Sequence, residues 1–130
     1  EKINPYMTCP SGGPLVQHAV VAMFEAHHQG KISVEKIVEK MCHNPAKIFK
    51  IEKRGFIKEG YYADIAIVNA YLPWNVKKEN ILYKCGWSPF EGYNFKSRVT
   101  HTFVNGKLVY HNGKVKDAKV GQRLLFEREV

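Results

Sequence analysis

Apolar side chains recur at helical spacing in a stretch near the start of the chain. Between residues 14 and 29 they fall three or four positions apart, at Leu15, Val16, Ala19, Val20, Met23, Phe24 and Ala26. This spacing places them on one broad face and predicts a helix over residues 14–29 with a buried side. Pro14 suits the first helical turn, and Gly30 suits the left-handed residue just past the end.

A second helix is predicted to begin at Ser33, whose hydroxyl can cap the first turn, while Glu35 complements the positive helix end. Its apolar stripe consists of Ile37, Val38, Met41 and Cys42. We expect this helix to stop at His43, because Pro45 disfavours helical geometry at the residue before it. Asn44 then predicts the N-cap of a third, short helical turn.

The second half of the chain has the pattern of strands. Residues 63–69 read A-D-I-A-I-V-N, a short β-branched run that predicts a strand. Residues 99–104 and 107–110 flank Asn105-Gly106, a strong short-range hairpin signal. A further turn at residues 111–113 precedes Lys114 and Val115.

The segment between these strands, residues 71–95, is rich in Pro, Gly, Trp and Tyr and predicts an ordered loop packed by its aromatic side chains. The order of loop, helices and strands divides the chain into residues 1–50 and residues 51–130. The helices follow no strand, and the strands are too few for a closed core. We therefore expect the chain to be part of a larger body.

Composition and charge exclude some classes of protein. The 130 residues carry a formal net charge of +8, but the lysines are spread along the chain and form no block of like charges. A nucleic-acid-binding module is therefore disfavoured. No apolar run of about 18 residues predicts a membrane span, and the first 13 residues do not have the pattern of a signal peptide. Three cysteines with no C-x-x-C pair favour reduced, buried thiols in the cytoplasm.

Four short sequence motifs resemble those of cyclic amidohydrolases. Residues 55–65 (G-F-I-K-E-G-Y-Y-A-D-I) are similar to the family's G-x-I-x-x-G-x-x-A-D-I, residues 44–49 to its N-P-A-x-I-F, and residues 104–109 to its V-x-G-x-x-V. The narrower motif is residues 87–92, W-S-P-F-E-G, which resembles the W-[ST]-P-F-E-G of dihydroorotases. The resemblance runs from Glu1 to about Val120.

This resemblance implies an α/β fold, a TIM barrel with a small β-sandwich, of which this chain forms the last barrel helices and the C-terminal sandwich strands. It implies a zinc-dependent hydrolase that interconverts N-carbamoyl-L-aspartate and dihydroorotate in pyrimidine synthesis. Zinc would activate a water and polarise the ring carbonyl. The family's metal ligands match no position here, so we expect them outside this chain. The implied partners are the small substrate, the rest of the barrel and identical subunits, with no nucleic acid or membrane.

The resemblance places the substrate-facing loop at residues 9–13, hereafter the substrate loop, and implies that backbone atoms near Pro10, Ser11 and Gly12 bind the substrate ring. The competing interpretation is a plain glycine turn that leads into a helix. We expect no catalytic residue and no metal ligand in this chain, because the spacing of the six histidines forms no known metal motif.

Other polar and aromatic residues are assigned structural roles. Adjacent His27 and His28 are expected to face solvent at the end of their helix. Asp64 is expected to accept hydrogen bonds at the start of a strand. The aromatic motif, with Trp87, Pro89 and Phe90, is expected to form a buried corner that joins barrel to sandwich.

Three alternatives stay open at this point. The complete protein could be an allantoinase or hydantoinase, or a dihydroorotase-like protein without a metal site. From another class, the chain could be a free-standing basic module that binds nucleic acid, which predicts strongly salt-dependent binding.

Overall fold

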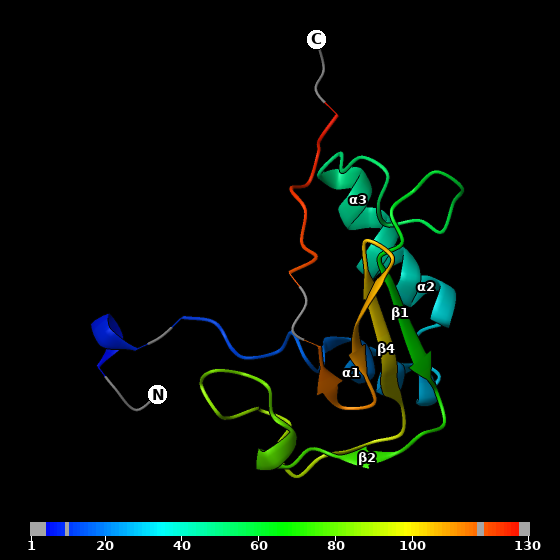
Figure 1. Cartoon of the computed structure of the whole chain (residues 1–130). Coiled ribbons are helices and arrows are strands. Elements are labelled where there is room, and N and C mark those ends of the chain that lie inside the picture. Colours follow the sequence, from blue (N-terminus) through cyan, green and yellow to red (C-terminus); the bar gives the residue numbers. More distant parts are fainter. Residues whose placement is uncertain (1–4, 10, 117–118, 128–130) are drawn as a thin grey trace.

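The computed structural model describes residues 5–9, 11–116 and 119–127. Helices occupy the first half and strands the second (Figure 1). The helical part contains a short 3₁₀ turn, three α-helices and one π-helical turn: η1 (Tyr6–Thr8), α1 (Ala19–His28), α2 (Val34–Val38), η2 (Glu39–His43) and α3 (Asn44–Ile48). Within the described residues, no helix has the length and apolar character needed to cross a membrane.

The first helix begins later than predicted. α1 starts at Ala19 instead of Pro14, and the preceding residues form turns closed by the bond from the N–H of His18 to the carbonyl of Leu15 (3.0 Å). The N–H of Gln17 donates to the hydroxyl of Tyr83 (2.8 Å) instead of a helical carbonyl. The backbone N–H of Gln17, which a longer helix would have paired internally, is therefore paired with a side chain distant in sequence.

The end of α1 agrees with the prediction. Gly30 has φ of +70°, the left-handed conformation expected just past the helix. The N–H of Lys31 donates to the carbonyl of Ala26, and that of Gly30 to the carbonyl of His27. This pair of bonds is the Schellman motif, which pairs carbonyls that the helix leaves open.

The predicted stop at His43 is wrong. Ser33 caps α2 as expected, since its hydroxyl accepts from the N–H of Lys36 (3.2 Å), but the chain then stays helical through η2 into α3. Pro45 has no N–H and its ring clashes with the carbonyl four residues back in a regular helix. The wider π turn avoids this clash: the N–H of Asn44 donates to Glu39, five residues back. Asn44 is accordingly helical and is not an N-cap.

The strands form a four-stranded antiparallel sheet in the order β1-β4-β5-β6. Their bounds are β1 (Ile65–Asn69), β4 (Arg98–Val104), β5 (Lys107–His111) and β6 (Lys114–Val115). Both predicted turns are confirmed, because Asn105-Gly106 and Asn112-Gly113 all have positive φ, the conformation of tight hairpin turns. The described strands make one such sheet, so the sandwich assignment needs a second sheet and stays a prediction.

The aromatic segment, residues 71–95, is ordered as predicted and holds a small sheet of its own. β2 (Trp74–Asn75) pairs with β3 (Asn94–Phe95), and the 3₁₀ turn η3 (Lys78–Asn80) lies between them. Val76 and Phe95 are fully buried against Val21 of α1, with Trp74 and Phe90 packed around them. The central core therefore joins the helical half to the strand half. The division at residues 50 and 51 stays a prediction.

Candidate functional site

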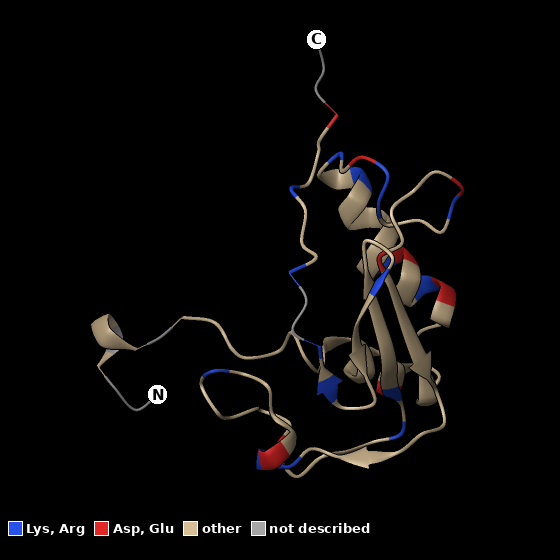
Figure 2. Cartoon of the chain, in the orientation of Figure 1, with Lys and Arg blue, Asp and Glu red and all other residues tan. Residues whose placement is uncertain are grey.

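The predicted substrate loop presents backbone and no charged side chain. Ser11, Gly12 and Gly13 are exposed, and Gly12 has φ of +77°, a conformation that favours glycine. Pro10 lies outside the described residues. In Figure 1 the described segment before α1 extends from the body of the molecule, and Figure 2 draws its residues 11–18 in tan, the colour of uncharged residues. The role of Ser11 and Gly12 as backbone contacts to a substrate ring stays a prediction.

His18 lies directly before α1 and is completely buried. Its ring is roughly parallel to those of Trp74 and Phe95, with centroid distances of 5.8 and 6.0 Å, while Tyr83 and Phe90 meet it edge-on. Its Nδ1 lies 3.1 Å from the hydroxyl of Ser88. Burial away from water lowers the pKa of His18, so the ring is held in its neutral form.

The buried aromatic corner expected from Trp87, Pro89 and Phe90 is formed partly by other residues. Phe90 packs into the core, but Pro89 is exposed and Trp87 is only half-buried. Trp74 and Phe95, outside the W-S-P-F-E-G motif, lie in the same core, where Phe95 is 1% exposed. Ser88 of that motif is 5% exposed and contacts His18. Within the motif, Ser88 is thus buried and the rings of Trp87 and Phe90 are half-buried.

The prediction that His27 and His28 face solvent is wrong. Both are half-buried; His27 Nδ1 lies 3.0 Å from the carbonyl of Ile32, and His28 Nε2 lies 2.9 Å from the hydroxyl of Ser97. The cysteines also depart from expectation, because Cys42 and Cys85 are exposed. Because α1 packs against β3 and β4, its last turn contacts these strands and their connection, where the sequence predicts solvent.

Asp64 is a structural acceptor, as predicted. One carboxylate oxygen pairs with the guanidinium of Arg54, and the other accepts the N–H of Asn105 (2.8 Å). Arg54 also donates to the side-chain oxygen of Asn105 (2.8 Å) and stacks over Tyr62. This triad joins residues from the family-like motifs at 55–65 and 104–109, with Arg54 directly before the first. It holds the start of β1 against the β4–β5 turn.

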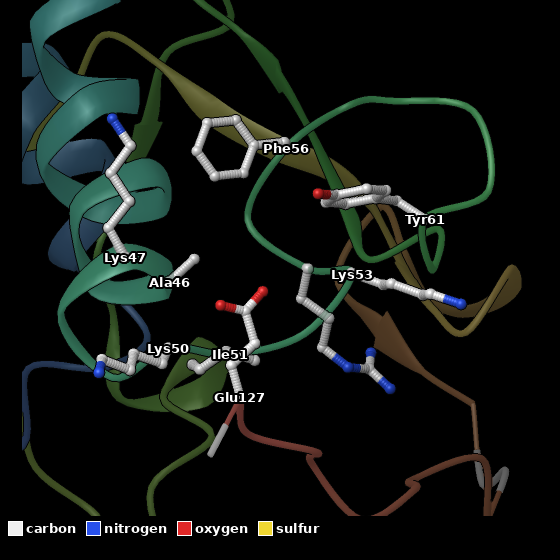
Figure 3. Close-up of a pocket in the computed structure, with 9 residues that line it drawn as sticks. Ala46, Lys47, Lys50, Ile51, Lys53, Phe56, Tyr61 and Glu127 are labelled. Atoms are coloured by element: carbon white, nitrogen blue, oxygen red, sulfur yellow. The ribbon is translucent and has the colours of Figure 1, made fainter. Parts of the chain in front are cut away.

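A cavity of about 370 Å³ lies on the side of α3 that faces residues 50–61. Figure 3 shows the rings of Phe56 and Tyr61 on one side and the carboxylate of Glu127 pointing toward Ala46, while Lys50 and Lys53 extend outward. The cavity shares no residue with the substrate loop. Lys47 and Arg54 line it as well, and Lys47 Nζ lies over the Phe56 ring, 5.8 Å from its centroid.

Within the described residues, no group of three or more His, Cys, Asp or Glu side chains could hold a metal ion. His101 and His111 face each other across β4 and β5, with ring centroids 4.5 Å apart, but no third potential metal ligand joins them among the described residues. A structural or catalytic zinc takes at least three protein ligands. The side chains described here therefore do not fit a zinc site by themselves.

Residues 9–109 match the model of the amidohydrolase family. The chain belongs to the amidohydrolase family. It is 36% identical over 115 residues to a dihydroorotase from Pyrococcus furiosus, which covers 88% of this chain and 28% of that protein. An allantoinase from Desulfitobacterium hafniense is 32% identical over 76% of this chain and 22% of its own length.

Solved structures of related enzymes share the fold of this amidohydrolase chain. A D-hydantoinase superposes with a TM-score of 0.77 at 23% identity, over 86% of this chain and 25% of that one. An L-hydantoinase from Arthrobacter aurescens gives 0.74 at 28% identity, over 83% of this chain and 24% of that one. The chain thus spans about a quarter of the length of the relatives it matches.

Sequence reasoning missed the buried contacts around α1. Gln17, His18, Tyr83 and Ser88 come together although the pairs lie 65 or more positions apart. The motif at residues 87–92 was a signal for part of this cluster. No local sequence pattern predicts that Gln17 contacts Tyr83, because the two residues are 66 positions apart.

Proposed function

We propose that the complete protein containing this chain is a dihydroorotase, which interconverts N-carbamoyl-L-aspartate and dihydroorotate. The observation that carries the proposal is the similarity to a dihydroorotase over 88% of the chain. The W-S-P-F-E-G motif at residues 87–92 supports the same choice. The zinc that such an enzyme uses would be bound outside this chain, and we expect the isolated chain to be inactive.

This chain would supply the substrate loop and one side of the enzyme's framework. Its accessible surface is 9829 Å², whereas a folded monomer of this mass exposes about 7,000 Å². The excess is of the size of a permanent protein interface. It supports the proposal that a barrel covers the helices, with this chain providing the last barrel helices and sandwich strands. A cytoplasmic location and an assembly of identical subunits are parts of the same proposal.

The charge distribution supports a small-molecule enzyme over a nucleic-acid-binding module. Figure 2 shows Lys and Arg distributed over helices, loops and the C-terminal segment, with acidic residues among them. Nucleic-acid binding depends on a stripe or patch of cations.

The decisive experiment measures ring opening of dihydroorotate, allantoin and hydantoin by the zinc-loaded full-length protein. We expect turnover of dihydroorotate and no turnover by residues 1–130 alone. Because the allantoinase and hydantoinase similarities are also clear, turnover of allantoin or hydantoin without dihydroorotate would replace the proposal by that activity.

The same assay tests the substrate loop through Gly12→Val. A side chain at φ of +77° costs about 1–2 kcal/mol, and the space around Gly12 is open, so the loop can move to relieve this strain. We expect KM for dihydroorotate to rise about tenfold. The matched control is Gly113→Val, which has φ of +87° and equally open space in the β5–β6 turn. Unchanged kinetics in the Gly12 variant would show that the loop is only a connector.

A further inference from the structure

The chain between the substrate loop and α1 is bound to distant segments at its last two residues, Gln17 and His18. Among the described residues, those at 11–14 make no hydrogen bond, and Leu15 makes only the turn bond to His18. Val16 is 90% exposed. Among the described residues from 11 onward, the first with a hydrogen bond to a distant part of the chain is Gln17. The place where the loop leaves the body is therefore set at Gln17.

Gln17 is bound through its backbone and through both ends of its side chain. Its backbone N–H donates to the hydroxyl of Tyr83 (2.8 Å), its side-chain nitrogen donates to the carbonyl of Asn80 (2.8 Å), and its side-chain oxygen accepts the N–H of Leu82 (2.9 Å). A carboxamide carries a donor and an acceptor on separate atoms, and Gln17 uses both here. A glutamate side chain in its place would set a carboxylate oxygen against the carbonyl of Asn80.

The partner segment is itself anchored to the core. The Tyr83 hydroxyl lies 3.4 Å from Nδ1 of buried His18, and Ser88 approaches the same nitrogen. Asn80 donates to the carbonyl of Asn75 in β2 (2.8 Å). Residues 80–83 thus connect Gln17 to a part of the molecule that packs tightly around His18.

We propose that Gln17 is a positioning residue for the substrate loop, held by Tyr83 and Asn80 of the aromatic segment. This inference rests on the proposed function, because it assigns the loop's path to binding of the cyclic amide. Gln17 touches no substrate. It fixes the C-terminal end of residues 11–16 and so aligns the backbone groups that meet the ring.

Two variants of the full-length protein test this inference. Gln17→Glu removes the donor to Asn80, and Tyr83→Phe removes the hydroxyl while keeping the ring beside His18. We expect each to raise KM for dihydroorotate about tenfold with less than a twofold change in kcat, because losing one positioned polar contact is worth about 1.4 kcal/mol. Hydrogen exchange should quicken in residues 11–18 and 80–83 together, and stay unchanged in β4.

The controls match each change in chemistry. Gln29→Glu introduces the same charge at an exposed position after α1, and Tyr71→Phe removes a hydroxyl from a residue that is 82% exposed. The inference is overturned if exchange in the two segments is unchanged, if kcat falls while KM stays the same, or if the controls raise KM equally.

The exchange measurement separates this inference from the proposed function. A wild-type protein inactive on dihydroorotate would overturn the proposed function, while faster exchange of the two segments in Tyr83→Phe would still show that Gln17 holds the loop. If Gln17→Glu does not fold, Tyr83→Phe alone decides the question.

Discussion

His18 illustrates how one residue can link the helical and strand halves of the chain. Its ring is surrounded by four aromatic side chains, and Nε2 has no hydrogen-bond partner among the described residues. A buried polar atom without a partner costs stability, and a charge in its place costs more. The site therefore tolerates neutral histidine and resists imidazolium.

The stability of the protein should depend on the protonation of His18. Its ordinary pKa is near 6.5, and burial lowers the pKa in the folded state. Above pH 6.5 both states are neutral and His18 adds no pH dependence. Below pH 6.5 the unfolded state takes up the proton first, so the free energy of unfolding falls until the folded pKa is reached.

Thermal denaturation of the full-length protein between pH 5 and 8 measures this effect. We expect the wild-type midpoint to fall more steeply below pH 6.5 than that of His18→Phe, which fills the aromatic site without a titrating group. Replacing exposed His111 by Phe is the control and should leave the slope unchanged. Parallel slopes for wild type and His18→Phe would contradict this prediction.

At the scale of elements, Gly55 sets how closely α3 approaches the following loop. Its φ is +80°, and an added Cβ would lie 2.5 Å from the Ala46 side chain and 2.7 Å from the Cys42 carbonyl. That carbonyl belongs to the π turn at Glu39–His43. The family-like motifs at residues 44–49 and 55–65 thus meet where Gly55 packs against the Ala46 side chain.

Gly55→Ala should be strongly destabilising. The left-handed conformation and the collision with a backbone carbonyl together should lower the free energy of unfolding by about 3 kcal/mol. Denaturant unfolding of the full-length protein measures this. Gly60→Ala is the matched control, since Gly60 has φ of +78° but open space around it, and it should cost only about 1 kcal/mol. Equal losses of unfolding free energy in the two variants would contradict the prediction, because the collision with Ala46 and Cys42 would then add nothing to the effect of the left-handed conformation.

At the scale of the whole molecule, the chain leaves many large apolar side chains uncovered. The most exposed are Met7, Val16, Ile48, Phe49, Ile57 and Tyr71. The buried core, by contrast, is small and centred on Val21, Val76 and Phe95. Burial of one large apolar side chain is worth about 1.5–3 kcal/mol, which makes a covering partner energetically favourable.

We therefore expect residues 1–130 alone to self-associate or to bind a dye that reports exposed apolar surface. Sedimentation at several protein concentrations, with dye fluorescence in parallel, measures both. Adding the separately expressed preceding part of the protein should suppress dye binding if it covers these side chains. A compact monomer without dye binding would contradict the prediction and show that the helices need no further partner.

Local chemistry explains why much of the fold could be predicted. Asn105-Gly106 and Gly30 adopt positive φ because their neighbours in sequence require it, and Ser33 caps the turn that follows it. The failures at Pro14 and His43 have a different origin. The N–H of Gln17 is bound by Tyr83, and the π turn lets the helix pass Pro45.

The sequence by itself determined the hairpins, the end of α1 at Gly30, the Ser33 cap of α2 and the resemblance to amidohydrolases, because these depend on residues within a few positions of one another. Only the tertiary structure decided that His18 is buried, that Gln17 binds residues 80–83, and that Arg54, Asp64 and Asn105 form one network. The contacts that hold Gln17 and His18 join residues more than 60 positions apart. A side chain's partner at that separation depends on the path of the whole chain, which no local pattern contains.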